Sequence, residues 1–398
     1  MQKSNRTQTY LLLLLILSTS HFLNDLMQSL IPASYPLLKA KYSLDFIQIG
    51  LISLTFQVAG ASLQPIVGMI TDKNAAPYSP VVGMIFTFSG LVSLAFAQNY
   101  QIILISVVLI GIGSSIFHPE ATRMARYAAG NRQGLAQGIF QVGGQAGGSL
   151  GPICAAIILV PWGLSSLSIF AILALLAMIL LVWIGSKQRE ISLEFSKNQE
   201  KLRNKTKLIV FSPLKISMCL SILIFLIFTK NFYSESFRSF YTFYLIDHFG
   251  LSIQASQLML FIFLFSAAIG VLIGGIIGDK IGRYWIIMIS VLGPLPLTII
   301  LPYADLFWTG VLTILINLVM ASAFASILIY AIDLLPNRIG LIGGLFYGLN
   351  FGLGGIAAGF LGVITEKYGI ENTYLICSFM PFAGLMVWFL PRMDNKLK

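Results

Sequence analysis

The chain has 398 residues, of which 57% are hydrophobic and 10% charged, and its mean hydropathy is +0.86. Soluble domains carry about 25% charged residues, so this composition excludes an ordinary soluble domain and indicates a membrane protein. The net charge of +10 would suit a nucleic-acid partner. However, the Lys and Arg residues gather on alternate connecting segments, which is the positive-inside pattern of membrane proteins, and we expect no nucleic acid.

Apolar stretches of the ~20 residues needed to cross hydrocarbon recur along the whole chain. Apolar and polar residues do not alternate at period two within them, which excludes a β-barrel. The backbone N–H and C=O groups must therefore be hydrogen-bonded within helices. The sequence therefore predicts an all-α integral membrane protein with twelve transmembrane helices, at residues 8–38, 46–71, 79–97, 101–127, 133–160, 163–186, 214–245, 251–278, 285–302, 306–332, 338–364 and 371–391.

The basic residues also predict an orientation. If the N-terminus is cytoplasmic, most Lys and Arg residues lie on cytoplasmic segments, and Lys39, Lys41 and Lys367 fall outside. Both termini are then cytoplasmic, in the inner or plasma membrane. The basic start and apolar core of residues 1–20 are also typical of a signal peptide. Because the apolar stretch continues to Leu38 and further spans follow, we expect a retained first helix.

The longest basic run predicts a cytoplasmic linker at residues 187–213, between six-helix halves at 1–186 and 214–398. The two halves share loop residues, as expected for an internal repeat. After span two stand Gly68, Asp72 and Lys73, and after span eight stand Gly275, Asp279, Lys280, Gly282 and Arg283. A second echo precedes these spans, at 43–48 and 252–257. We expect two pseudo-symmetric bundles.

The three cysteines, Cys154, Cys219 and Cys377, all fall inside apolar spans. They have neither a paired spacing nor the spacing of metal ligands. We expect small core residues, with no disulfide, metal site or cofactor.

Charged residues inside the spans follow a pattern. Away from the helix ends they fall in spans one, four and seven, namely Asp25, Glu120, Arg123, Lys230, Glu235 and Arg238. Burying such a group costs ~2.5 to 3.5 kcal/mol even on the lenient insertion scale. Every third helix is therefore polar, which predicts that each half contains two three-helix units whose first helices line a shared path.

The first span carries a polar stripe. His21, Asp25 and Gln28 are spaced three and four residues apart and so share one helix face, with Asn24 beside them. A histidine can exchange a proton with a neighbouring carboxylate near neutral pH, which predicts a proton-coupling site at His21 and Asp25. Asn24 and Gln28 would contact substrate. The alternative is a hydrogen-bond network between helices.

In span four, Glu120 and Arg123 are three residues apart, directly after His118 and Pro119. Two interpretations stay open. Glu120 would either relay protons or form an internal salt bridge with Arg123 near the cytoplasmic interface.

Span seven carries Lys230, Tyr233, Glu235, Arg238 and Tyr241. Lysine and arginine at that depth suit an anionic substrate, the arginine as a bidentate fork and the lysine as a point charge. We expect Lys230, Tyr233, Arg238 and Tyr241 to bind substrate and Glu235 to take part in proton coupling. Alternatively, Glu235 neutralises Arg238, and Lys230 has Asp25 as its nearest candidate partner.

Glutamines extend the polar surface. Gln57 in span two and Gln141 in span five, the latter flanked by Gln137 and Gln145, carry amides that both donate and accept. They suit a wet substrate cavity, or they hold neighbouring helices together.

Twelve helices in two halves with these repeated loops resemble the major facilitator superfamily of transporters. In span five, Gly138, Gly147, Gly151 and Pro152 are similar to that superfamily's signature for proton-exchanging exporters, although small residues also allow close helix packing. The first loop departs from the superfamily pattern, with Ala75 and Ala76 where glycine and a basic residue are usual.

Longer strings, at 21–30, 113–120, 134–144 and 302–310, resemble the fosmidomycin resistance proteins. The resemblance implies a proton-coupled antiporter that exports a small anionic compound such as fosmidomycin. We expect protons and the lipid bilayer as its other partners, and a monomer. The alternatives are proton-coupled uptake of a sugar or organic acid, a non-transporting sensor, or an intramembrane enzyme using His118 and Glu120.

Overall fold

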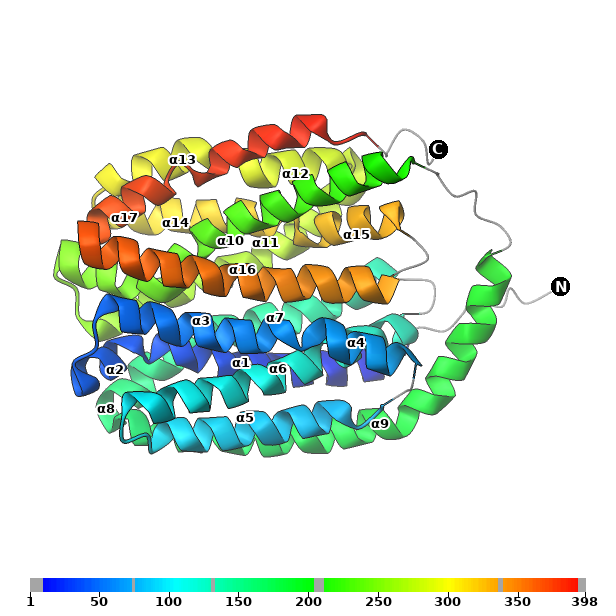
Figure 1. The fold of residues 1–398 in the computed structure, drawn as a ribbon, viewed down its shortest axis with the longest axis horizontal. Coiled ribbons are helices and arrows are strands. Elements are labelled where there is room, and N and C mark those ends of the chain that lie inside the picture. The colour runs from blue at the N-terminus through cyan, green and yellow to red at the C-terminus, as the bar shows by residue number, and fades with distance from the viewer. Residues whose placement is uncertain (1–9, 74–75, 130–132, 204–210, 336–338, 393–398) are drawn as a thin grey trace.

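The computed structural model describes residues 10–73, 76–129, 133–203, 211–335 and 339–392. The helices lie roughly parallel along the longest axis of the molecule (Figure 1). The first group comprises α1 (Leu11–Ala33), α2 (Tyr35–Tyr42), α3 (Phe46–Ser62), α4 (Gln64–Lys73), α5 (Ser79–Ala95), α6 (Tyr100–Ala128), α7 (Gln133–Cys154), a π-helical segment (Ala155–Leu159), α8 (Val160–Trp162), a 3-10 turn (Leu164–Ser166) and α9 (Leu167–Arg203).

The second group begins after residues 204–210, which lie outside the described part. It comprises α10 (Pro213–Phe249), α11 (Ile253–Ile281), α12 (Arg283–Leu292), α13 (Leu295–Ile300), a 3-10 turn (Leu301–Tyr303), α14 (Leu306–Ala321), α15 (Phe324–Leu334), α16 (Ile339–Tyr368), α17 (Ile370–Cys377) and a 3-10 segment (Met380–Phe389).

The prediction of an all-helical membrane protein is confirmed. Within the described residues, eleven helical stretches are long and apolar enough to cross a membrane, and Ser79–Ala95, with 17 residues, is a shorter apolar helix in the place of predicted span three. Large apolar side chains such as Leu12, Ile105, Ile172, Ile179 and Phe360 point outward. Lipid rather than water suits that surface.

Helix starts follow capping chemistry. The Asp45 side chain accepts from the Gln48 backbone N–H, and the Asp45 backbone N–H donates to Gln48 Oε1. The segment 43–48 therefore contains the capping box of α3. Its echo at 252–257 is also a helix start, because Ser252 accepts from the Ala255 N–H. The repeated string thus marks equivalent helix starts.

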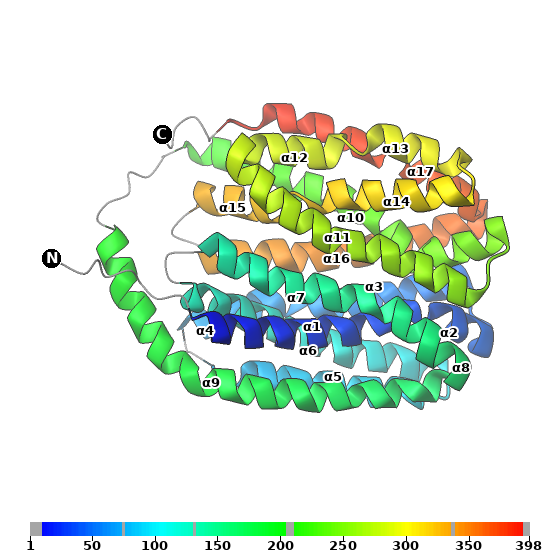
Figure 2. The same ribbon diagram turned by 180° about the vertical axis from the view of Figure 1, so that it is seen from behind.

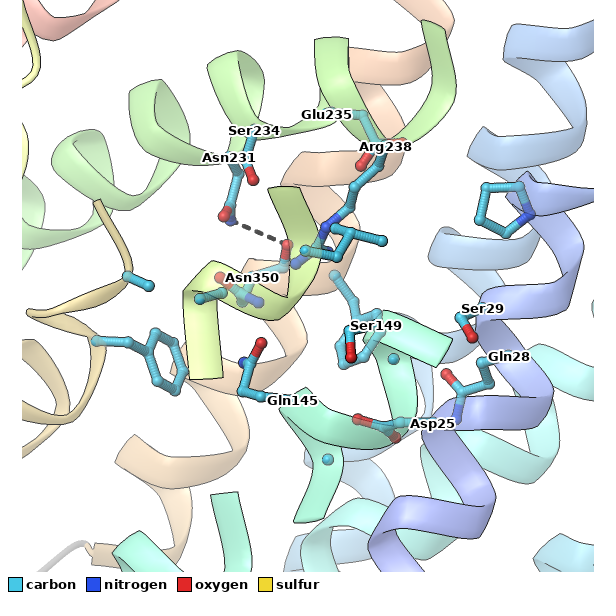
Figure 3. A pocket seen from close by; sticks show the side chains of 18 of the residues that line it. Asp25, Gln28, Ser29, Gln145, Ser149, Asn231, Ser234, Glu235, Arg238 and Asn350 are labelled. Carbon is cyan, nitrogen blue, oxygen red and sulfur yellow. Dashed lines mark hydrogen bonds between the residues drawn. The ribbon is translucent and has the colours of Figure 1, made fainter. Parts of the chain in front are cut away.

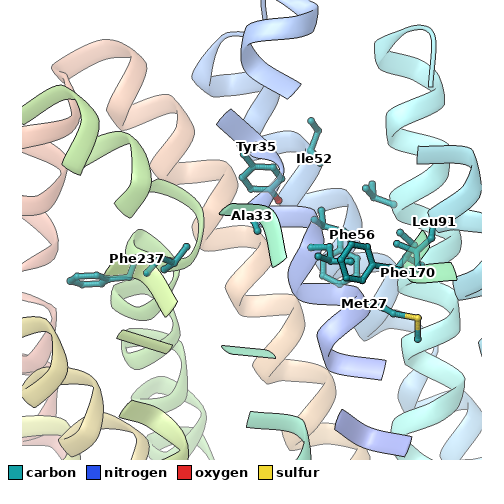
Figure 4. Close-up of a cluster of buried hydrophobic side chains, with 14 of the residues drawn as sticks. Met27, Ala33, Tyr35, Ile52, Phe56, Leu91, Phe170 and Phe237 are labelled. Carbon is teal, nitrogen blue, oxygen red and sulfur yellow. The ribbon is translucent and has the colours of Figure 1, made fainter. Parts of the chain in front are cut away.

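The two groups of helices meet along two seams. Helix α3 packs against α16, and α7 packs against α11 (Figures 1 and 2). Inside the first group, an apolar core forms from α1, α3, α5 and α9, with Met27, Ile52, Phe56, Leu91 and Phe170 (Figure 4). Helix α9 continues past the end of the bundle (Figure 1), so the predicted linker at 187–213 is helical as far as Arg203.

Candidate functional site

A cavity of about 250 Å³ lies between the two groups. Asp25, Gln28 and Ser29 of α1 and Gln145 and Ser149 of α7 lie across it from the polar face of α10 (Figure 3). The lining includes most of the polar residues that the sequence singled out, namely His21, Asp25, Gln28, Gln57, His118, Gln141, Lys230, Glu235 and Arg238. Spans one, four and seven therefore do share a cavity.

Asp25 lies between two histidines. Its Oδ2 is 3.2 Å from His21 Nε2, one helical turn earlier on α1, and its Oδ1 is 3.5 Å from His118 Nε2 on α6. Both histidines are buried, whereas Asp25 is 23% exposed toward the cavity. We call His21, Asp25 and His118 the Asp25 cluster. One side-chain nitrogen or oxygen atom from each of the three residues lies within 4.8 Å of the other two.

Glycines of α7 bring α1 and α7 together at this cluster. A Cβ on Gly144 would lie 2.8 Å from Asp25 Oδ2 and would also overlap the His21 ring, and one on Gly147 would overlap the Phe22 carbonyl. Gly151 packs in the same way against Ser29, whereas a Cβ on Gly138 would meet nothing within 4 Å. Three of these glycines thus serve close packing.

Lys230 belongs to the second group of helices and is held in place by residues of that group. Its Nζ donates to Ser290 Oγ of α12 at 2.7 Å, and Ser290 donates in turn to the Met320 carbonyl at 2.8 Å. No carboxylate of the described residues lies within 4.0 Å of this ammonium. The structure therefore does not pair Lys230 with Asp25, and two of the three ammonium protons stay available to other acceptors.

Glu235 is buried on the same helix, α10, and also lines the cavity. Its Oε1 accepts from Ser53 Oγ of α3 at 3.1 Å and from Ser239 Oγ at 2.5 Å, and Gln57 donates to Ser53 at 2.9 Å. Its carboxylate lies more than 4.0 Å from the Arg238 guanidinium. The carboxylate thus connects the two groups of helices, and the exposed side chain of Arg238 lines the cavity.

Three predicted substrate contacts lie away from the cavity lining. Tyr233 and Tyr241 pack against Phe237, and Tyr241 Oη lies 3.5 Å from Thr313 Oγ1. The reason is helical phase: positions 230, 234 and 238 face the cavity, whereas 233, 237 and 241 point into an aromatic cluster. Asn24 is buried behind Asp25 and donates to its Oδ1 at 2.9 Å.

Glu120 also lies outside the cavity lining. It accepts from Arg123 Nη1 at 3.0 Å and from Gln188 of α9. Arg123 in turn donates to the Thr71 and Gly68 carbonyls at the end of α4. This geometry is the internal salt bridge that the sequence left open, and the neighbour that meets Asp25 is His118.

The loop residues are only partly described. The side chains of Asp72, Lys73, Asp279 and Lys280, and the surroundings of Gly275, lie outside the described residues. Gly282 has φ +92°, which favours glycine, and separates α11 from α12. Arg283 then forms an ion pair with Asp333 of α15.

The model of the Major Facilitator Superfamily matches residues 17–359 and 232–398. The chain is 51% identical over 385 residues to the fosmidomycin resistance protein of Escherichia coli K12, covering 96% of this chain and 93% of that protein.

The chain belongs to the major facilitator superfamily, in the family of the fosmidomycin resistance protein.

A further relative and a solved structure with the same fold are also similar to this chain. The MFS-type transporter YfnC of Bacillus subtilis 168 is 38% identical over 393 residues, covering 97% of this chain and 94% of that protein. The crystal structure of a bacterial homolog to the human lysosomal transporter Spinster, inward-facing and unoccupied, superposes with a TM-score of 0.71 at 15% identity, covering 98% of this chain and 95% of that one. As a superfamily member, the protein is a membrane transporter and not an enzyme.

Sequence reasoning missed several site residues of this superfamily member. In the sequence, His118 and Gly144 stand only within strings that carry the family resemblance, and His118 has a role only in the enzymatic alternative. Ser53 and Ser290 are not singled out there. The sequence did contain one signal for His118. This residue stands directly before Pro119 and Glu120, in a span that carries charged residues. Nothing in one sequence says which face of span four meets span one.

Proposed function

We propose that the protein exports small anionic compounds such as fosmidomycin in exchange for protons, by alternating access. The observation that carries this proposal is that Asp25 of the first group and Lys230 of the second line one cavity. The 51% identity to the fosmidomycin resistance protein supports the choice of compound. In this proposal the protein is a monomer in the cell membrane with both termini cytoplasmic.

The Asp25 cluster is the proposed proton site. A carboxylate beside two imidazoles can take up and release protons near neutral pH. Asp25 is the member of the cluster that remains partly exposed to the cavity, so protons can reach it from the same space that admits substrate.

Lys230 and Arg238 are the proposed anion-binding groups. Lys230 is held by Ser290 and has no carboxylate within 4.0 Å among the described residues. Across the cavity from Arg238, Gln28 is buried with an Nε2 that has no hydrogen-bond partner in the described structure (Figure 3). A phosphonate would supply acceptor oxygens for all three donors.

Cross-group hydrogen bonds support alternating access. Toward the predicted outside, Gln257 donates to the Ala33 carbonyl at 3.0 Å and the Phe46 N–H donates to Glu366 at 3.1 Å. Toward the predicted cytoplasm, Gln137 donates to Tyr347 Oη at 2.8 Å. Residues 1–186 and 214–398 are the proposed moving halves, with 187–213 as the linker, and these bonds would break on one side at a time.

The energetics favour exchange. An inward proton gains ~2.3 kcal/mol per 100 mV and ~1.4 kcal/mol per unit of pH difference. An anion leaving a negative interior gains a similar electrical term. The membrane potential therefore favours both movements, whereas a cationic compound would leave against the potential and be repelled by Lys230 and Arg238.

The test uses purified protein in liposomes preloaded with fosmidomycin and a pH-sensitive dye. With acid outside, we expect fosmidomycin to leave and protons to enter, and a protonophore to abolish any uphill export. Fosmidomycin efflux without proton entry would refute exchange. In empty liposomes with fosmidomycin and acid outside, entry of fosmidomycin together with protons would make uptake the correct direction.

A further inference from the structure

The hydrogen bonds of the two buried histidines determine which ring nitrogen carries a proton. His21 Nδ1 lies 2.9 Å from the Phe140 carbonyl, and His118 Nδ1 lies 2.9 Å from the Ser114 carbonyl and 3.2 Å from Ser114 Oγ. A carbonyl oxygen only accepts. The close carbonyl favours Nδ1 as the donor in each ring, with Ser114 Oγ as a second acceptor beside His118, and a neutral ring then carries its proton on Nδ1 and leaves Nε2 bare.

Both bare nitrogens face the same carboxylate, but different oxygens of it. His21 Nε2 is 3.2 Å from Oδ2, and His118 Nε2 is 3.5 Å from Oδ1. A bare nitrogen and a carboxylate oxygen are both acceptors and form no bond. Each contact becomes a charge-assisted hydrogen bond only when Nε2 holds a proton, so the cluster offers two separate proton positions.

No second carboxylate of the described residues is close enough to satisfy the rings. The His21 ring stacks on Phe140, and the His118 ring packs against Phe117 of its own helix and Phe351 of α16. The other charged groups facing the cavity are Lys230, Glu235 and Arg238 of α10, and neither histidine has Glu235 within 4.0 Å. Asp25 is therefore the counter-charge for both rings.

We infer that the Asp25 cluster binds two protons, one on Nε2 of His21 and one on Nε2 of His118, so that two protons are exchanged for each exported anion. The exchange of two protons for each anion rests on the proposed function, whereas the two proton-binding positions do not. With two neutral rings the cluster carries the single negative charge of Asp25, and with two imidazolium rings it carries a net single positive charge. The ring centroids are 5.3 Å apart, so two positive charges on the rings would repel each other, and the Asp25 carboxylate between them offsets that repulsion.

The first experiment detects the protons on the His21 and His118 rings directly and needs no substrate. The chain has three histidines, and the third, His248, lies on the surface beside Glu371. In the His248→Gln protein, labelled with ¹⁵N-histidine and held in lipid nanodiscs, NMR should show two rings. We expect both neutral rings to carry the proton on Nδ1 and both Nε2 atoms to gain protons on acidification. His21→Gln and His118→Gln, made separately in this background, should each leave one ring and assign the signals.

Two results of this experiment would overturn the inference. One is a neutral ring with its proton on Nε2, and the other is a ring that never gains a second proton while the protein stays folded. Stoichiometric transition metal that persists through purification and is lost in Asp25→Asn would also overturn it, because the cluster would then hold a metal ion in place of the protons.

The second experiment measures the coupling ratio with fosmidomycin as the probe. In liposomes clamped at zero membrane potential, a two-proton exchanger balances one unit of pH difference against an about 100-fold fosmidomycin gradient, and a one-proton exchanger against about tenfold. We expect about 100-fold for the wild type and about tenfold for His118→Gln. A wild-type value of tenfold refutes two-proton exchange. Complete absence of fosmidomycin movement refutes the proposed function, while the NMR result still decides the two proton positions.

Discussion

Asp25 of α1 and His118 of α6 meet in the cavity, with Oδ1 and Nε2 3.5 Å apart. The contact joins predicted spans one and four. The sequence identified span one as polar by its stripe of His21, Asp25 and Gln28, and span four by Glu120 and Arg123. The contact places a proton acceptor where two helices of the same half converge, opposite the basic face of α10 (Figure 3).

Replacing Asp25 by asparagine should abolish proton coupling. The amide keeps the shape of the side chain but cannot hold the negative charge that stabilises protonated imidazoles. In the liposome assay, fosmidomycin-dependent proton entry should fall at least tenfold, to the level of empty vesicles, while the protein elutes normally in size-exclusion chromatography.

The matched control for this substitution is Asp247→Asn, an exposed carboxylate at the end of α10 and outside the cavity lining. It should transport like the wild type. Normal coupling in Asp25→Asn would show that the aspartate has only a structural role.

Replacing Lys230 by glutamine should weaken anion binding. A hydrogen bond to a charged group contributes about 1.5–3 kcal/mol, and 1.4 kcal/mol is a factor of ten, so the apparent KM for fosmidomycin should rise by about 10- to 100-fold. Initial efflux rates over a range of internal concentrations measure this change. Lys215→Gln, on the same helix but exposed outside the cavity, should leave KM unchanged, and equal effects of both variants would contradict a binding role.

Adding a methyl group to Gly144 should disturb the Asp25 cluster. The new Cβ would lie 2.8 Å from Asp25 Oδ2, closer than van der Waals contact, so Asp25 or His21 must move. We expect Gly144→Ala to lose proton coupling with an intact fold. Gly138→Ala makes the same change on the same helix, where a Cβ meets nothing within 4 Å, and its coupling should be normal. If the two variants behave alike, the packing of α7 does not position the carboxylate.

Glu120 should matter for stability rather than for coupling. It is buried, pairs with Arg123 at 3.0 Å and lies outside the cavity lining. Removing one partner of a buried ion pair costs about 3–5 kcal/mol, so Glu120→Ala should lower the free energy of unfolding by up to that amount. The milder Glu120→Gln should keep proton coupling in liposomes, and a loss of coupling in well-folded Glu120→Gln would restore Glu120 as a proton carrier.

The fold was accessible from the sequence because its main signal is local. Each span must satisfy its own backbone in hydrocarbon, so an apolar run of sufficient length reports a helix without knowledge of its neighbours. The repeated strings at 43–48 and 252–257 were correctly placed for a similar reason, since capping bonds connect residues three apart. The sequence also predicted a span at 79–97, where the structure has the short helix Ser79–Ala95 of 17 residues.

By itself, the sequence determined the membrane class, the helices, the family resemblance and the set of polar residues buried among apolar ones. Only the tertiary structure decided which of them meet. It turned Glu120 toward Arg123, brought His118 to Asp25, and pointed Tyr233 and Tyr241 away from the cavity. The physical reason is that helix pairing depends on side-chain shape at close contacts, such as Gly144 against Asp25, and residues on different helices leave no periodic trace of that contact in a single chain.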